Sequence, residues 1–261
     1  MMIQVARPML SKGDTANTQI LGGENGEKVR EGEKEVEYDF VPLVRPIYNA
    51  LIPRLESLDI DQEIKECSIS TVGMLFAVFG DQLRDELPGV LTLLKKRLVN
   101  ELTRLPTLKA LATMAGSTLH LDLSPVLTDC TVELSQFLRQ QSRGLRLSAL
   151  VTISALVDSP CATLTDENIT IIVTEITGLI NDSDLHLTHL TLLLVKSVLN
   201  KSPHSGCIIK SQVYTKMIDL SGSSLLHGAA LQSLISLFQE FVTANVDGLT
   251  YRNILDALYE R

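Results

Sequence analysis

Two pairs of metal-ligand residue types lie close together in the second half of the sequence. One pair is His186-x-x-His189 and the other is His204-x-x-Cys207. Histidine and cysteine at such spacings can hold zinc, whose ligands lie about 2.0–2.3 Å from the ion. A helix over 184–199, however, would place the two pairs about 22 Å apart, which is too far for a shared ion. We therefore predict that the protein has no metal site and no cofactor.

Nucleophilic catalysis has equally weak support in the sequence. A reactive cysteine needs an electropositive and partly exposed position, but Cys67 follows Ile64 by three residues in an apolar helical pattern. We expect the cysteines to be reduced and packed in the interior, because all of them are isolated in sequence: Cys67, Cys130, Cys161 and Cys207. Acidic clusters fall at expected turns and helix starts, where helix dipoles and solvent account for them. We predict that the protein is not an enzyme, and metal analysis tests the alternative of an enzyme built on the His and Cys pairs.

The composition favours helices and a protein partner. Hydrophobic residues make up 45% of the 261 residues, aromatic residues only 4%, and tryptophan is absent, so typical strand-forming residues are scarce. The formal net charge is −8, and the 23 lysines and arginines are dispersed along the chain. Such a charge pattern argues against binding to nucleic acid or to an anionic membrane. No small-molecule substrate is indicated either.

Targeting signals are not found in the sequence. The first eight residues lack the basic, apolar and cleavage regions of a signal peptide. The most apolar stretches, such as 190–195, are far shorter than the roughly 20 residues that span a membrane. We therefore expect a cytoplasmic and nuclear protein.

Amphipathic segments begin at Phe40 and come in pairs. Apolar residues recur at spacings of three and four within each segment, which is typical of helices. The expected pairs are 42–57 with 61–79, 88–102 with 105–115, 124–139 with 142–157, 166–180 with 184–199, and 208–220 with 223–242. A further segment over 249–259 begins a sixth pair that is cut off. We predict that no sheet forms and that the second helices start near Asp61, Arg104, Ser142, Asp184 and Ser223.

The second segments of these pairs show an internal repeat. An aliphatic residue followed in most cases by a basic one recurs every 37 to 44 residues, at Ile64, Leu108, Leu145, Leu187 and Leu226. This is the period of HEAT and armadillo repeats, and two helices per unit favour HEAT. We predict an all-α HEAT-repeat α-solenoid over 39–261, an internal part of a longer protein, in which each pair buries its apolar stripe against its neighbours. Residues 1–38 are polar and rich in glycine, and we expect them to be mostly disordered.

Several segments resemble the middle of one protein family. They are Asp59-Ile60-Asp61-Gln62-Glu63-Ile64-Lys65-Glu66, the stretch over 101–111, Leu121-Asp122-Leu123-Ser124-Pro125-Val126-Leu127, and the later stretches over 181–187 and 224–231. The chain resembles the cullin-associated and neddylation-dissociated proteins from about Phe40 to its end. This resemblance implies a helical scaffold that wraps an unneddylated cullin bound to its RING subunit. It also implies regulation of SCF complex assembly by exchange of substrate receptors. The alternative is another HEAT-repeat adaptor, of the nuclear transport receptor or phosphatase scaffold type.

The repeat geometry indicates where a partner would bind. Second helices of HEAT pairs line the concave side of the superhelix, and basic residues lie near the starts of consecutive second helices: Lys65, Lys109, Arg143 and Arg146. Stacking would align these four residues into a basic ladder on an acidic protein, which would speed association with an acidic surface. The alternative is that these basic residues pair with acidic residues of neighbouring repeats.

Overall fold

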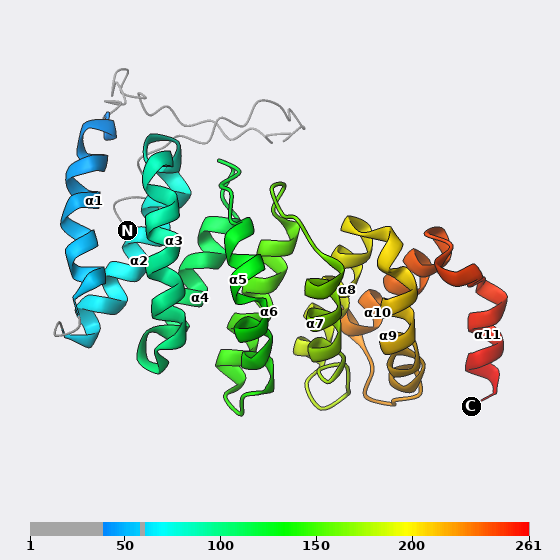
Figure 1. The fold of residues 1–261 in the computed structure, drawn as a ribbon. Coiled ribbons are helices and arrows are strands. Elements are labelled where there is room, and N and C mark those ends of the chain that lie inside the picture. The colour runs from blue at the N-terminus through cyan, green and yellow to red at the C-terminus, as the bar shows by residue number, and fades with distance from the viewer. Residues whose placement is uncertain (1–38, 58–60, 261) are drawn as a thin grey trace, which may run out of the picture.

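The computed structural model describes residues 39–57 and 61–260 (Figure 1). The polar segment over 1–38 lies outside the described residues. In the described part the regular structure is helical, without strands, and consists of eleven α-helices with short 3-10 turns between some of them. The helices are α1 Val41–Glu56, α2 Gln62–Phe79, α3 Leu87–Val99, α4 Glu101–Ala115, α5 Ser124–Gln136, α6 Arg143–Asp158, α7 Asp166–Thr177, α8 Leu185–Lys201, α9 Gly206–Ser221, α10 Gly228–Thr243 and α11 Tyr251–Tyr259.

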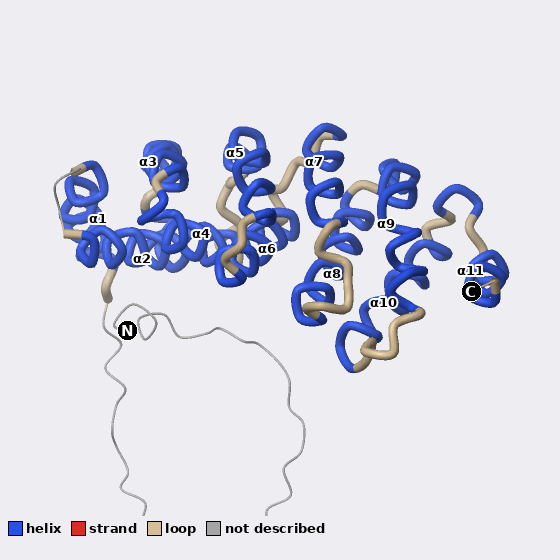
Figure 2. Tube along the Cα trace, turned by 90° about the horizontal axis from the view of Figure 1, so that it is seen from below, coloured by secondary structure: helices blue, strands red, loops and turns tan. Residues whose placement is uncertain are grey.

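The helices form two stacked rows. Seen end-on to most helices, the odd-numbered helices make an outer arc and the even-numbered helices α2 to α10 make an inner one (Figure 2). Each odd-numbered helix from α1 to α9 begins a helix pair, and α11 starts a sixth pair. The predicted all-α solenoid with five helix pairs is therefore confirmed, and the second helices line its inner side. None of the described helices has the length and apolarity that crossing a membrane requires.

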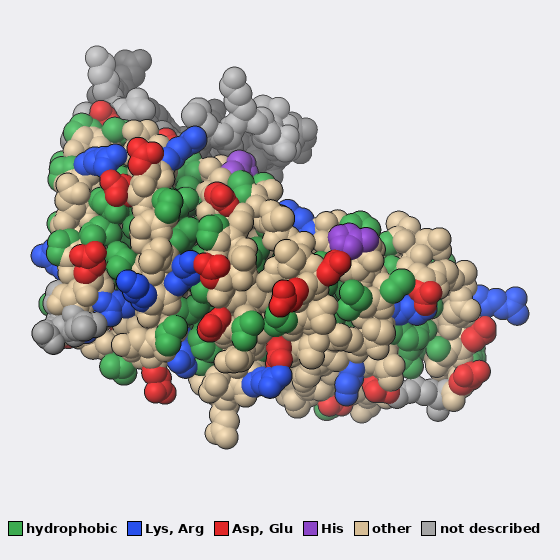
Figure 3. All heavy atoms as spheres, in the orientation of Figure 1, with side chains coloured by type: hydrophobic (Ala, Val, Ile, Leu, Met, Phe, Trp, Pro, Cys, Tyr) green, Lys and Arg blue, Asp and Glu red, His purple; other side chains and the backbone are tan. Residues whose placement is uncertain are grey.

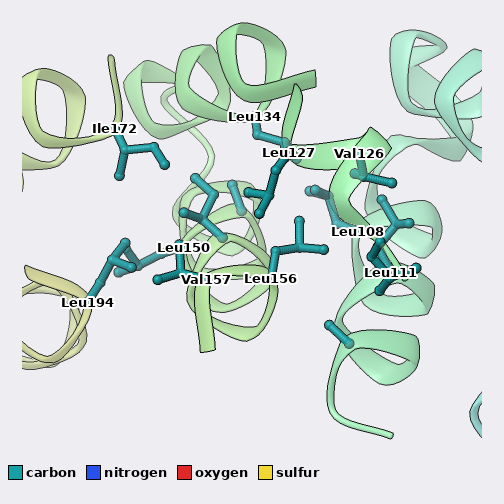
Figure 4. Close-up of a cluster of buried hydrophobic side chains, with 14 of the residues drawn as sticks. Leu108, Leu111, Val126, Leu127, Leu134, Leu150, Leu156, Val157, Ile172 and Leu194 are labelled. Carbon is teal, nitrogen blue, oxygen red and sulfur yellow. The ribbon is translucent and has the colours of Figure 1, made fainter. Parts of the chain in front are cut away.

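One continuous core joins the repeats. It runs from Val44 on α1 to Ile254 on α11 and takes buried side chains from both rows. In its central part, buried side chains of the inner row, such as Leu108 and Leu150, and of the outer row, such as Leu127 and Ile172, lie between the two rows (Figure 4). Because a single pair leaves its apolar stripe half exposed, the stacking of neighbours supplies most of the hydrophobic stabilisation.

Capping residues set the starts of three inner helices where the sequence predicts them. The side chain of Asp61 accepts a hydrogen bond from Glu63 N, that of Ser142 from Leu145 N, and that of Asp184 from Leu187 N. Each bond satisfies one of the unpaired N–H groups at a helix start.

The start of α4 differs from the prediction. It begins at Glu101, with Asn100 as its cap, and not near Arg104. Pro106 lies inside the helix, where it has no N–H to donate to the carbonyl of Leu102. That carbonyl accepts a hydrogen bond of 2.9 Å from Gln62 Nε2 of α2. A contact with another repeat therefore makes the internal proline tolerable.

The start of α10 also differs. The helix begins at Gly228 and not near Ser223. Ser223 instead donates a hydrogen bond of 2.7 Å to Asp182 in the loop of the preceding repeat. Gly228 has a φ of 59°, a left-handed conformation that glycine adopts without steric cost. The apolar pair Leu225 and Leu226 thus belongs to the connection, although its pattern continues that of the helix.

Candidate partner-binding surface

Each inner helix exposes one stripe of side chains away from the outer row. On α6, for example, Leu147, Val151, Ser154 and Asp158 are exposed or half-buried at spacings of three and four. Most of the residues between them pack into the core, as Leu150 does. The exposed stripes of α2, α4, α6, α8 and α10 lie on the inner arc (Figure 2). We refer to them together as the inner surface.

Lys65 and Lys109 lie at the N-terminal end of the inner surface. Lys109 is exposed, whereas Lys65 is half-buried. Lys109 borders a shallow hollow of about 320 Å³ between α2 and α4, whose other lining residues are Glu63, Glu66, Cys67, Ser70, Leu105 and Pro106. The hollow therefore carries charge of both signs, in contrast to a purely basic ladder.

Arg143 and Arg146 are engaged in contacts within the protein. Arg143 forms an ion pair with Asp184, the capping residue of α8 in the next repeat, with 2.6 Å between Nε and Oδ2. This is the inter-repeat pairing that the sequence offers as the alternative. Arg146 donates to the carbonyl oxygens of Gln140 and Gln141, at 2.9 and 3.1 Å. The structure thus does not bring the four basic residues into one set of free cations.

The Arg143–Asp184 pair gives a prediction about pH. Hydrogen bonding from Arg143 holds the pKa of Asp184 below its ordinary value of 3.8. The stability that this pair contributes is present above that value and is lost as the pH falls through the folded-state pKa. We expect Arg143→Gln to lower the unfolding midpoint at pH 7 and the difference from wild type to vanish at lower pH. The control is Arg146→Gln, whose contacts are carbonyls and whose effect should not depend on pH in this range; a parallel loss in both variants would contradict the prediction.

The two candidate ligand pairs are far from forming one site. His189 shares a hydrogen bond of 2.6 Å with Ser233 on α10, and His204 shares one of 3.0 Å with Asp166 on α7. Helix α8 is continuous from Leu185 to Lys201 and separates the pairs. In the described part of the chain, no group of three or more His, Cys, Asp or Glu residues is arranged to hold a metal ion.

The cysteines correct one sequence prediction. Cys130 alone is buried, and burial raises the pKa of its thiol to about 11. Cys161 is half-buried, while Cys67 and Cys207 are exposed. Cys67 was expected in the core because it follows Ile64, but Ile64 itself is 46% exposed. Cys67 borders the hollow between α2 and α4 and is not buried in their contact, so an apolar spacing at a helix start did not mark the core.

The outer face offers a different kind of surface. Basic and acidic side chains are interspersed over the odd-numbered helices (Figure 3). Many of them form ion pairs between neighbouring repeats, such as Lys95 with Asp129 and Lys210 with Asp247. A hollow of about 510 Å³ lies between α3 and the loop before α5, where His120 adopts a φ of 50°. The ion pairs tie repeats together, and we do not assign the outer face a partner.

Comparisons with known proteins identify the relatives of the chain. It is 39% identical over 231 residues to cullin-associated NEDD8-dissociated protein 1 of Arabidopsis thaliana, which covers 87% of this chain and 19% of that protein. It is 35% identical to the protein 1 of Dictyostelium discoideum over 85% of this chain, and 35% identical to cullin-associated NEDD8-dissociated protein 2 of Mus musculus over 83%. The chain belongs to the cullin-associated NEDD8-dissociated family. It spans less than a fifth of the length of these relatives, 18% of the latter two.

The fold comparison agrees with the helical repeats of this family member. A designed armadillo repeat protein in complex with the peptide (KR)4 superposes with a TM-score of 0.57, covering 81% of this chain and 90% of that chain. Its sequence identity is 13%, so the likeness concerns the fold alone. No protein-family model matches the chain.

Sequence reasoning missed one feature of the inner surface of this family member. Val151, Leu193 and Ile235 are exposed on α6, α8 and α10. The apolar spacing assigns them to the core-facing stripes of their helices, because a sequence pattern does not separate exposed aliphatic residues from core residues. Their separation of 42 residues, close to the repeat period, was the available signal.

Proposed function

We propose that this protein is a non-catalytic scaffold that binds an unneddylated cullin and its RING subunit through the inner surface. The observation that carries the proposal is the 35–39% identity over 83–87% of the chain to proteins named for association with cullins. The solenoid supports the proposal, because a row of stacked helices offers an extended concave surface to a protein partner. The finer proposal is that binding regulates SCF complex assembly by exchange of substrate receptors.

The charge and the cysteines support further parts of the proposal. A net charge of −8 with dispersed basic residues disfavours nucleic acid and anionic membranes as partners. All four cysteines are free thiols, which suits a reducing compartment. We propose that the protein works in the cytoplasm and the nucleus, with the cullin complex as its partner and no small-molecule substrate.

A binding experiment tests the proposal. Purified chain is immobilised and exposed to an unmodified cullin–RING complex, to the same complex carrying NEDD8, and to nuclear transport cargo and phosphatase subunits. We expect retention of the unmodified complex and weak or no retention of the others. Equal retention of the NEDD8-modified complex, or retention of cargo or phosphatase subunits instead, would contradict the proposed function.

Charge reversal at Lys109 tests the use of the inner surface. Lys109 is the exposed basic residue of the hollow between α2 and α4, and Lys96 is a similarly exposed lysine on α3 in the outer row. We expect Lys109→Glu to slow association with the cullin complex about three- to tenfold at low salt, because an exposed charge acts mainly on the rate of encounter. Lys96→Glu should change it little, and both effects should fade at high salt. Equal slowing by the two variants would exclude the inner surface as the binding side.

A further inference from the structure

Three exposed aliphatic side chains occupy equivalent positions on consecutive inner helices. Val151, Leu193 and Ile235 are 43%, 39% and 43% exposed, and they are separated by 42 residues each. They are the ninth, ninth and eighth residues of α6, α8 and α10. We call these three residues the aliphatic row.

Contacts between the helices fix the register of the row. Arg143 of α6 pairs with Asp184 at the start of α8. Lys196 of α8 donates to Ser236 of α10 at 2.8 Å and pairs with Glu240 at 3.3 Å. These partners are 40 to 44 residues apart, which agrees with the separation within the row. Because neighbouring packed helices lie about 8–10 Å apart, the row crosses the three helices at that spacing.

The surroundings of the row are nearly uncharged. The residues three and four positions away from its members on the three helices are all exposed or half-buried: Leu147, Ser148, Ser154, Ala155, His189, Leu190, Lys196, Ser197, Leu231, Gln232, Phe238 and Gln239. The charge of Lys196 in this region is balanced by its pair with Glu240. The hollow between α2 and α4 is different, since Glu63, Glu66 and Lys109 border it. The aliphatic row therefore lies in a less charged part of the inner surface than the hollow does, although the exposed Asp158 lies two helical turns from Val151 on α6.

This division defines the chemistry of the occupant. A charged side chain laid over the less charged part would lose its hydration without a compensating partner, so the contacting side there must be apolar. At the other end, Glu63 and Glu66 complement a basic residue and Lys109 complements an acidic one. Seven residues of an α-helix rise about 10.5 Å, which is close to the spacing of the row. An amphipathic helix with apolar residues at i, i+7 and i+14 matches all three positions.

We propose that one amphipathic helix of the cullin lies across α6, α8 and α10 and packs apolar side chains against Val151, Leu193 and Ile235. Charged residues of the cullin contact the hollow between α2 and α4. This inference rests on the proposed function and adds the contact that holds the complex together. Burial of the row slows dissociation, whereas the charged hollow acts on association. The aliphatic row is thus the anchor of the inner surface.

A triple variant tests the anchor. The inner variant carries Val151→Gln, Leu193→Gln and Ile235→Gln, and dissociation of the unmodified cullin–RING complex is followed by surface plasmon resonance. The control variant carries the same change at exposed aliphatic residues outside the row, Val99, Val132 and Leu225, which are 67%, 47% and 58% exposed. We expect the inner variant to raise Kd about 100-fold, mainly through faster dissociation and with little dependence on salt. The control variant should bind as the wild type does.

Each other outcome overturns the inference. If the wild type binds and the inner variant binds equally well, or if both variants lose the same affinity, the aliphatic row is not the anchor and the proposed function stands. If the wild type does not bind the complex, both the proposed function and the role of the aliphatic row are contradicted. Sedimentation equilibrium separates one more case: self-association that the inner variant abolishes would show that a second copy of the chain covers the row. Circular dichroism checks that both variants keep the wild-type helical content, as expected for substitutions of exposed side chains.

Discussion

Substitution of Arg97 by methionine is expected to destabilise the first two repeats by about 2–4 kcal/mol. Arg97 is on α3 and is only 8% exposed. Its guanidinium reaches the end of α1, where Nε donates to the carbonyl oxygen of Leu55 at 2.9 Å and an Nη atom donates to that of Ser57 at 3.1 Å. The last carbonyls of a helix have no partner within the helix. Methionine would fill the space but leave the buried carbonyl of Leu55 and the partly buried carbonyl of Ser57 without this donor.

Hydrogen exchange locates this loss. Because each repeat contacts only its neighbours, we expect faster amide exchange in α1 and α3 and unchanged exchange in α7 to α10. Arg97→Lys should fall between methionine and wild type, since a lysine keeps the charge but not the forked geometry. Lys96→Met, at the exposed neighbouring position, is the control and should have little effect. Wild-type stability of Arg97→Met would show that water or the backbone satisfies the carbonyls of α1 equally well.

The helix pairs could be predicted because the signals that define them are local. Apolar spacing marks each segment, and Asp61, Ser142 and Asp184 provide capping side chains. The starts of α4 and α10 could not be predicted because they depend on contacts with other repeats. Gln62 binds the carbonyl that Pro106 leaves free, and the loop of the preceding repeat binds Ser223. A single sequence does not show such partners.

The candidate surface was only partly predictable for a similar reason. Lys109 was placed on the inner surface by the repeat period and is exposed there. The partner of Arg143 is fixed by how far α8 lies from α6, and that of Arg146 by the path of the preceding loop. The aliphatic row was missed because Val151 and its equivalents have the same residue types as the core. Only the stacked helices show which of these residues solvent reaches.

The second large loss of stability is expected from a substitution where α2 and α4 approach closely. Gly73 of α2 is buried, and a Cβ added there would lie 2.8 Å from the Cβ and 2.9 Å from the Cα of Ala110 on α4. Such contacts are shorter than van der Waals distance and involve backbone, which cannot rotate away. Overpacking of this kind typically costs about 1–3 kcal/mol. An alanine inside a helix stabilises it by at most about 1 kcal/mol relative to glycine. The steric cost is larger, so the net effect of the substitution is destabilising.

We therefore expect Gly73→Ala to lower the urea midpoint of unfolding, with the loss confined to the repeats of α2 and α4. Gly89 on α3 is the matched control, because a Cβ there meets no atom within 4 Å. Gly89→Ala should stabilise the protein by a few tenths of a kcal/mol, up to about 1 kcal/mol. Adding Ala110→Gly to Gly73→Ala removes the closest contact but not the one with the Cα, so recovery should be partial. Stabilisation by Gly73→Ala would mean that α2 and α4 can move apart freely, and the hollow that Lys109 borders would then lack a fixed shape.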